Sequence, residues 1–85
     1  MAQINSIYAD RLMAVAAAIG RLSALGVAVI EIDINRARPV INVQPCAAVR
    51  KLKGVQFARR GTPTGPVNRH QANLNDCRIE WEVHP

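Results

Sequence analysis

The first third of the chain has the hydrophobic period of an amphipathic α-helix. Its apolar residues recur at spacings of 4, 3, 4 and 3, which places them on one stripe of a helix with about 3.6 residues per turn; they are Tyr8, Leu12, Val15, Ile19 and Leu22. Asn5 or Ser6 can cap the start of this helix, and Gly26 can end it in the left-handed conformation. The pattern therefore predicts one long helix that ends near Gly26.

The opposite side of this helix is unusually poor in long side chains and carries Asp10, Arg11, Ala14, Ala17, Ala18 and Arg21. Ala is the strongest helix former, which is one sufficient reason for its presence there. The other interpretation is that small residues allow a second helix to approach closely, and it predicts an oligomer face and a homodimer. The residues of that candidate face are Ala14, Ala17, Ala18 and Arg21.

After Gly26 the hydrophobic period changes to the alternation of β-strands. Residues 27–34 are expected to form a strand whose buried side holds Ile30, Ile32 and Ile34, while Glu31 and Asp33 face water. A turn at residues 35–39 leads to a partner strand, residues 40–44, with Ile41 and Val43 on the buried side.

The second half of the chain predicts a short helix followed by three more segments. Residues 45–53 begin with Pro, carry basic residues in the last turn and stop at Gly54, which is typical of a helix. Residues 55–58 are expected to be a strand with Val55 and Phe57 on one face, and residues 61–66 a loop. Residues 69–74 and 77–83 are expected to pair as a hairpin through the turn Asn75-Asp76.

The element order is therefore α-β-β-α-β-β in one domain, residues 1–85, because 85 residues leave no room for a second core. We expect an α+β fold with a four-stranded, mostly antiparallel sheet packed against the long N-terminal helix. If the sheet is a meander, the turn at 35–39 and the loop at 60–67 fall at the same end. The basic residues that would then converge are Arg36, Arg38, Arg59, Arg60 and Arg69.

The charge is concentrated in the middle of the chain. The net charge is +5, yet residues 35–75 contain no acid. A positive field of this kind attracts phosphates or an acidic protein surface, although a solvated surface that maintains solubility explains it as well. The candidate binding residues are Arg36, Arg38, Arg50, Lys51, Lys53, Arg59, Arg60 and Arg69.

The sequence contains few residues that could serve in catalysis or bind a metal ion. The carboxylates of the strands are expected on solvated faces, where nothing shifts their pKa values; they are Glu31, Asp33, Glu80 and Glu82. His70 and Cys77 could lie side by side across the hairpin, an arrangement that more often serves packing than nucleophilic catalysis. Cys46, Cys77, His70 and His84 lack the paired spacing of zinc ligands. We expect no enzyme activity, no metal and no cofactor.

Location follows from the cysteines and from the one long apolar segment. Cys46 and Cys77 do not form the dense framework of a secreted domain, so we expect two free thiols in a reducing cytoplasm. In residues 12–30 Arg21 lies near the middle of the segment, where a charge opposes insertion, so we expect no membrane role.

Two classes of binding partner remain. Exposed aromatic residues for base stacking are not expected, because Tyr8, Phe57 and Trp81 all occupy positions on the apolar side of their predicted helix or strand. Binding to DNA or RNA would therefore rest on phosphate contacts alone, as in a sequence-nonspecific nucleic-acid-binding module. The other class is a small inhibitor or adaptor that engages an acidic protein surface or a nucleoprotein complex.

The chain also resembles small accessory proteins of bacteriophages and prophages. The resemblance lies in its length, its α+β order and its terminal strand Asn-Asp-Cys-Arg-Ile-Glu-Trp-Glu-Val, residues 75–83. It implies an inhibitor of host defence, of which anti-CRISPR proteins are one kind, and it transfers no functional residues. We therefore expect a phage-type binding protein that acts on a host protein or nucleoprotein complex through its Arg-rich surface.

Overall fold

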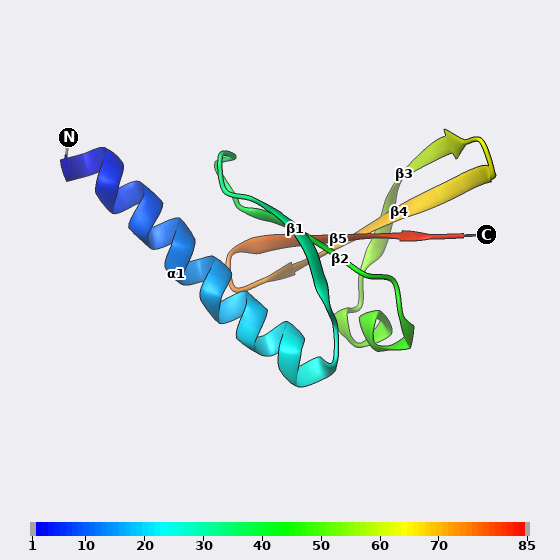
Figure 1. The fold of residues 1–85 in the computed structure, drawn as a ribbon, viewed down its shortest axis with the longest axis horizontal. Helices are drawn as coiled ribbons and strands as arrows, with labels where there is room; N and C mark the ends of the chain where they lie inside the picture. Colours follow the sequence, from blue (N-terminus) through cyan, green and yellow to red (C-terminus); the bar gives the residue numbers. More distant parts are fainter. Residues whose placement is uncertain (1, 85) are drawn as a thin grey trace.

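A computed structural model describes residues 2–84, with side chains from residue 4 onward. The α+β class is confirmed: one long helix is followed by a mixed five-stranded sheet interrupted by a short 3₁₀-helix (Figure 1). The elements are α1 (Ala2–Leu25), β1 (Val29–Asp33), β2 (Val40–Val43), η1 (Ala47–Leu52), β3 (Val55–Thr62), β4 (Gly65–Leu74) and β5 (Cys77–Val83). Within residues 2–84, no helix combines the length and the apolar character needed to cross a bilayer.

The sheet has the strand order β1-β2-β5-β4-β3. β2 and β5 are parallel, and the other neighbouring pairs are antiparallel. The C-terminal strand is therefore the central one, and the chain between β2 and β5 makes η1 and the β3–β4 hairpin at the far side of the sheet. The predicted, mostly antiparallel sheet is present, but it has five strands rather than four, because each of the five predicted strand segments forms a separate strand. The sheet is not a meander, because the chain passes from β2 through η1 to the far edge strand β3.

The expected loop at residues 61–66 is instead part of a long hairpin. Pairing between β3 and β4 continues to Thr62 opposite Gly65, so only Pro63 and Thr64 remain as the turn. Gly65 has a φ of 117°, which only glycine adopts readily. Composition predicted a loop because Gly and Pro favour turns, but their backbone conformations also fit a tight connection between paired strands.

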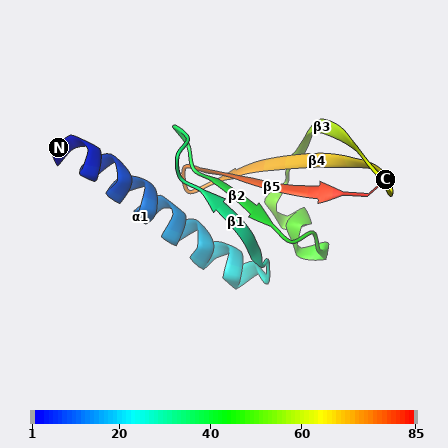
Figure 2. The same ribbon diagram turned by 45° about the horizontal axis from the view of Figure 1, so that its top comes forward.

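The helix α1 packs against the sheet only with its C-terminal half, while its N-terminal half projects beyond the strands (Figure 2). Val15, Ala18 and Leu22 are buried, and Gly26 ends the helix with a φ of 80°. The predicted end is thus confirmed. The predicted oligomer face is wrong at Ala18, which is fully buried against the sheet, while Ala14 is half-buried and Ala17 and Arg21 are exposed.

The burial of β1 differs from the prediction. Ile30 and Ile32 are exposed, whereas Val27 is buried and Val29 packs against the core. The pairing of β1 with β2 shifts register between Val29 and Glu31, and β1 is an edge strand. A bulge breaks strict alternation, so the face of a residue no longer follows from its position alone. The burial of Ile41 and Val43 on β2 is confirmed.

The two remaining strand predictions have different outcomes. On β3, Val55 and Phe57 are both exposed, and a register shift lies between Gln56 and Ala58. The β4–β5 hairpin is confirmed, with Asn75 and Asp76 both at positive φ, as a tight hairpin turn requires.

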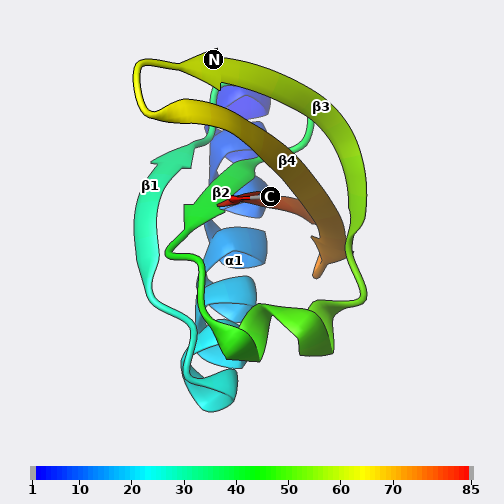
Figure 3. The same ribbon diagram turned by 90° about the vertical axis from the view of Figure 1, so that its right-hand side faces the viewer.

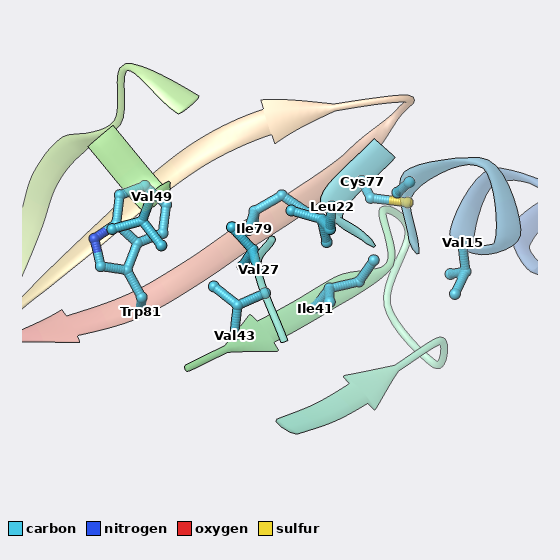
Figure 4. Packing of buried hydrophobic residues seen from close by; sticks show 10 residues of the cluster. Val15, Leu22, Val27, Ile41, Val43, Val49, Cys77, Ile79 and Trp81 are labelled. Carbon is cyan, nitrogen blue, oxygen red and sulfur yellow. The ribbon is translucent and has the colours of Figure 1, made fainter. Parts of the chain in front are cut away.

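The hydrophobic core lies on the face of the sheet that α1 and η1 cover. It contains the alternate residues Cys77, Ile79 and Trp81 of the central strand β5. In Figure 4, Leu22 of α1 lies near Ile79, and Val49 of η1 lies beside the Trp81 ring. Figure 3 shows α1 behind the strands and η1 below them, and residues of both helical segments belong to the same core cluster. The indole therefore packs under η1 rather than under α1.

Candidate functional site

The eight predicted binding residues do not converge at one end of the sheet. Arg36 and Arg38 belong to the β1–β2 turn, and the pairing of Val40 with Arg78 places this turn next to the start of β5. The β3–β4 turn lies at the opposite end of β4, whose ten residues span roughly 30 Å. The expected convergence, which assumed a meander, is therefore wrong.

Two of the predicted residues, Arg60 and Arg69, belong to a row of alternating charges on the sheet face away from α1. We call this row the open-face ladder; it consists of Arg60, Glu82, Arg69, Glu80 and Arg78. Arg69 lies 2.9 Å from Glu80 and 2.8 Å from Glu82, and Arg78 lies 2.9 Å from Glu80. Glu80 is only 8% exposed, so the prediction that it faces water is wrong.

The ladder also engages the aromatic ring of Phe57. The Arg78 guanidinium lies 4.7 Å from the ring centroid, and that of Arg69 lies 6.0 Å from it. Such geometry is a cation–π contact. The ring, although partly exposed, thus interacts with the protein's own cations, and the arginines of the ladder pair with its own carboxylates.

The basic residues of the β1–β2 turn also have partners within the protein. Arg36 lies 3.2 Å from the Asp33 carboxylate, and Arg38 donates a hydrogen bond of 3.0 Å to Asn73. The backbone N–H of Asn35 donates to Asp33, and this bond, together with Arg36, lowers the pKa of the Asp33 carboxyl. The turn is thus held by local polar contacts.

The remaining predicted residues surround η1. Val49 is buried and Leu52 packs against the core, which fixes one side of the short helix to the sheet. Arg50, Lys51 and Lys53, which we call the η1 basic cluster, are exposed. Within the part of the chain that the structure describes, none of the three makes an ion pair within 4.0 Å, in contrast to Arg36, Arg60 and Arg69.

The chain after η1 passes very close to the indole of Trp81. Lys53 has a left-handed φ of 53°, and its N–H donates to the Arg50 carbonyl. A Cβ at Gly54 would lie 2.6 Å from Cζ2 of Trp81 and 2.8 Å from the Gln71 carbonyl oxygen. Glycine is therefore required here, and it lets the basic end of η1 lie directly on the sheet.

A cleft of about 660 Å³ lies between η1 and the sheet. Its apolar lining consists of the exposed Ala47, the half-buried Val83 and the buried Val49 and Trp81, and its polar lining includes Arg50, Lys53, His70 and His84. Glu82 is the single acid of the lining, and its carboxylate is already held by Arg60 and Arg69.

By its register, Arg59 of β3 lies on the same face of the sheet as Val83. It pairs with Asn68, which in turn pairs with Val83 of the cleft. Two strand spacings place its backbone roughly 10 Å from that of Val83. The structure thus brings together three of the eight predicted residues, Arg50, Lys51 and Lys53, at η1, while Arg59 lies on the edge strand β3 outside the lining of the cleft.

The histidine and cysteine residues do not form a reactive centre. His70 faces Trp81, with ring centroids 6.0 Å apart, while Cys77 faces Leu74, so His70 and Cys77 do not lie opposite each other across the hairpin. Both thiols are free, and burial raises the pKa of Cys77. Among residues 2–84, no three His, Cys, Asp or Glu side chains lie close enough together to hold a metal ion.

Sequence reasoning missed the cleft because its apolar surface and its rim come from three separate segments. The pattern signalled burial of Trp81 and a helix at η1, but nothing in it shows that η1 lies over the indole. Comparisons of the chain with protein-family models, with curated protein sequences and with solved structures find no match.

Proposed function

We propose that this protein is a non-catalytic binding protein that engages an acidic surface of another protein, alone or within a nucleoprotein complex. The contact is made by the η1 basic cluster and the adjoining cleft. The observation that carries the proposal is the division of the basic residues. Arg36, Arg60 and Arg69 pair with carboxylates of the protein itself, while the cations around the cleft are exposed and available to a partner.

The chemistry of the cleft supports a peptide or protein ligand. An apolar surface between cations accommodates an acidic segment that also carries an aliphatic or aromatic side chain. Arg50 can form a bidentate contact with a carboxylate, while Lys53 adds a point charge on a flexible stem. Long-range attraction by the net charge of +5 would accelerate the encounter with an acidic partner.

A nucleic acid fits this surface less well. Binding to single strands usually uses exposed aromatic rings that stack on bases. Trp81 is only 4% exposed. The partly exposed rings of Phe57 and Tyr8 already have guanidinium groups of the protein beside them, from Arg78 at 4.7 Å and from Arg11 at 5.7 Å. Nucleic acid would therefore be held by phosphate contacts alone, with strong dependence on salt.

The phage resemblance is consistent with this proposal and remains a hypothesis. An inhibitor of a host defence complex needs a surface that binds its target and needs no catalytic group, and a basic cleft is complementary to an acidic target. The cleft with its basic rim is the part of the described molecule that fits such a role.

The test compares two double charge reversals that alter the net charge equally. Arg50→Glu with Lys53→Glu changes the cleft, while Arg36→Glu with Arg38→Glu changes the distant turn. Each lowers the formal charge from +5 to +1, since each reversal removes two units. Immobilised wild-type protein and both variants are used to capture partners from bacterial lysate, before and after nuclease treatment, and bound proteins are identified by mass spectrometry.

We expect an acidic protein that is captured by the wild type and by the turn variant but lost with the cleft variant. Capture that is equal for both variants would show that the cleft is not the contact. A partner that disappears with nuclease would instead assign the surface to nucleic acid, and anisotropy titrations with single- and double-stranded oligonucleotides at low salt would then show binding.

A further inference from the structure

The N-terminal half of α1 exposes an apolar surface that no other part of the described chain covers. Ile4, Ile7, Tyr8 and Leu12 are 53%, 49%, 40% and 54% exposed. Arg11 donates a 3.0 Å hydrogen bond to the Ile34 carbonyl, and its guanidinium lies 5.7 Å from the centre of the Tyr8 ring. Before Arg11 the helix projects past the sheet (Figure 1).

Three of these side chains form one ridge along the helix. Ile4, Tyr8 and Leu12 are spaced by four residues, so they lie in a row of the kind that packs between helices. The ridge is symmetric about Tyr8, with an aliphatic residue four positions away on each side. Met13 is more exposed, at 71%, but points about 140° around the helix from Tyr8.

We propose that this ridge is the interface of a homodimer in which two α1 helices cross about a two-fold axis near Tyr8. Such an axis places Ile4 of one copy opposite Leu12 of the other, so the surface is complementary to itself. Two rows with this spacing pack at a crossing angle of about 50°. This interface differs from the Ala face expected from sequence, and it is independent of the cleft.

The charge distribution favours a second copy over a membrane surface. The projecting half of α1 carries Asp10 and Arg11, whose charges cancel, so it lacks the basic residues that attract anionic lipid headgroups. The η1 basic cluster lies away from the ridge, toward the opposite half of a molecule 46 Å long (Figure 1). Two copies joined through their ridges therefore keep their basic clusters apart, which limits repulsion because salt screens charges beyond about 10 Å.

The size of the ridge indicates a weak dimer. About half of each of the three ridge side chains is exposed, and burial in both copies would remove roughly 600 Å² of side-chain surface, which is below the usual size of stable interfaces. We therefore expect dissociation in the micromolar range. The dimer would present two clefts to a partner, which raises avidity without any new contact.

The test measures molecular mass by sedimentation equilibrium from about 1 to about 500 µM, a range that brackets this affinity. Tyr8→Glu introduces a carboxylate at the centre of the ridge, and Met13→Glu introduces the same charge on the same helix outside it. Both positions are exposed, so both variants are expected to fold, and circular dichroism checks this. We expect the wild type and Met13→Glu to dimerise and Tyr8→Glu to remain monomeric.

A second measurement tests the axis. In a Cys46→Ser background, Tyr8→Cys should form an interchain disulfide on mild oxidation, while Met13→Cys should not. A wild type that stays monomeric throughout the range overturns the proposal, whether or not it binds lipid vesicles. A dimer that persists in Tyr8→Glu overturns it as well, because the interface must then lie elsewhere.

Discussion

Replacement of Gly54 by Ala tests the packing of η1 against the central strand. The added methyl group would overlap Cη2 of the Trp81 ring and lie 2.6 Å from Cζ2, whereas carbon atoms in contact normally lie about 3.5–4.0 Å apart. Trp81 is 4% exposed and packs beside Val49, and the second obstacle is the Gln71 carbonyl of the β4 backbone. Neither can move without a shift of η1 or of the sheet.

Overpacking of this kind costs about 1–3 kcal/mol. In a domain of this size 1 kcal/mol corresponds to roughly 4–8 °C, so we expect Gly54→Ala to lower the Tm by about 5–20 °C. Thermal unfolding followed by circular dichroism measures this change. Trp81 is the single tryptophan, so its fluorescence reports directly on the affected packing.

Gly20→Ala is the matched control. Gly20 is exposed within α1, and a Cβ there would meet nothing within 4 Å. Removal of a helix-interior glycine stabilises by about 0.5–1 kcal/mol, so the same substitution should raise the Tm. A Gly54→Ala protein whose Tm stays within about 2 °C of the wild type would refute the close approach of η1 to Trp81.

Three further predictions concern the cysteines and Glu80. In native protein, iodoacetamide should modify the exposed Cys46 and leave Cys77, whose pKa is raised by burial and by Asp76, unmodified until denaturant is added, as mass spectrometry would show. Because the folded state disfavours the Cys77 thiolate, this group should lower stability as the pH rises above 9.0, the ordinary pKa of the unfolded thiol. Glu80→Gln should cost about 1–3 kcal/mol in chemical unfolding, because it removes the charge between two arginines, whereas Glu31→Gln on an exposed site should change stability by less than about 0.5 kcal/mol. Equal effects of the two substitutions would contradict a structural role of the open-face ladder.

The burial predictions held where local periodicity ran unbroken and failed at irregularities. Alternation along β5 correctly placed Cys77, Ile79 and Trp81 on the buried side. On β1 and β3, register shifts interrupt the alternation of buried and exposed residues, and Ile30 and Phe57 are exposed. A bulge depends on how two strands pair, and a single strand's pattern does not contain that information.

The sequence predicted which residues carry the positive charge of the candidate site, but it did not show which of them pair with carboxylates in the fold. The acid-free stretch of residues 35–75 correctly located the charge along the chain, but the carboxylates that neutralise Arg60 and Arg69 follow it in β5. Arg60 and Glu82 are 22 positions apart and meet only because β5 lies next to β4 in the sheet. The net charge is a sum over all ionisable residues of the sequence. The number of unpaired charges at a surface depends instead on which ion-pair partners the fold places beside each residue.

The sequence by itself determined the α+β class, the long helix with its end at Gly26, the β4–β5 hairpin and the excess of positive charge, because each depends on neighbouring residues. The tertiary structure decided the strand order, the cleft beside η1 and the projecting half of α1. These features arise from contacts between segments that are distant in the chain. Which cations and which apolar side chains remain available to a partner is therefore a property of the packed fold.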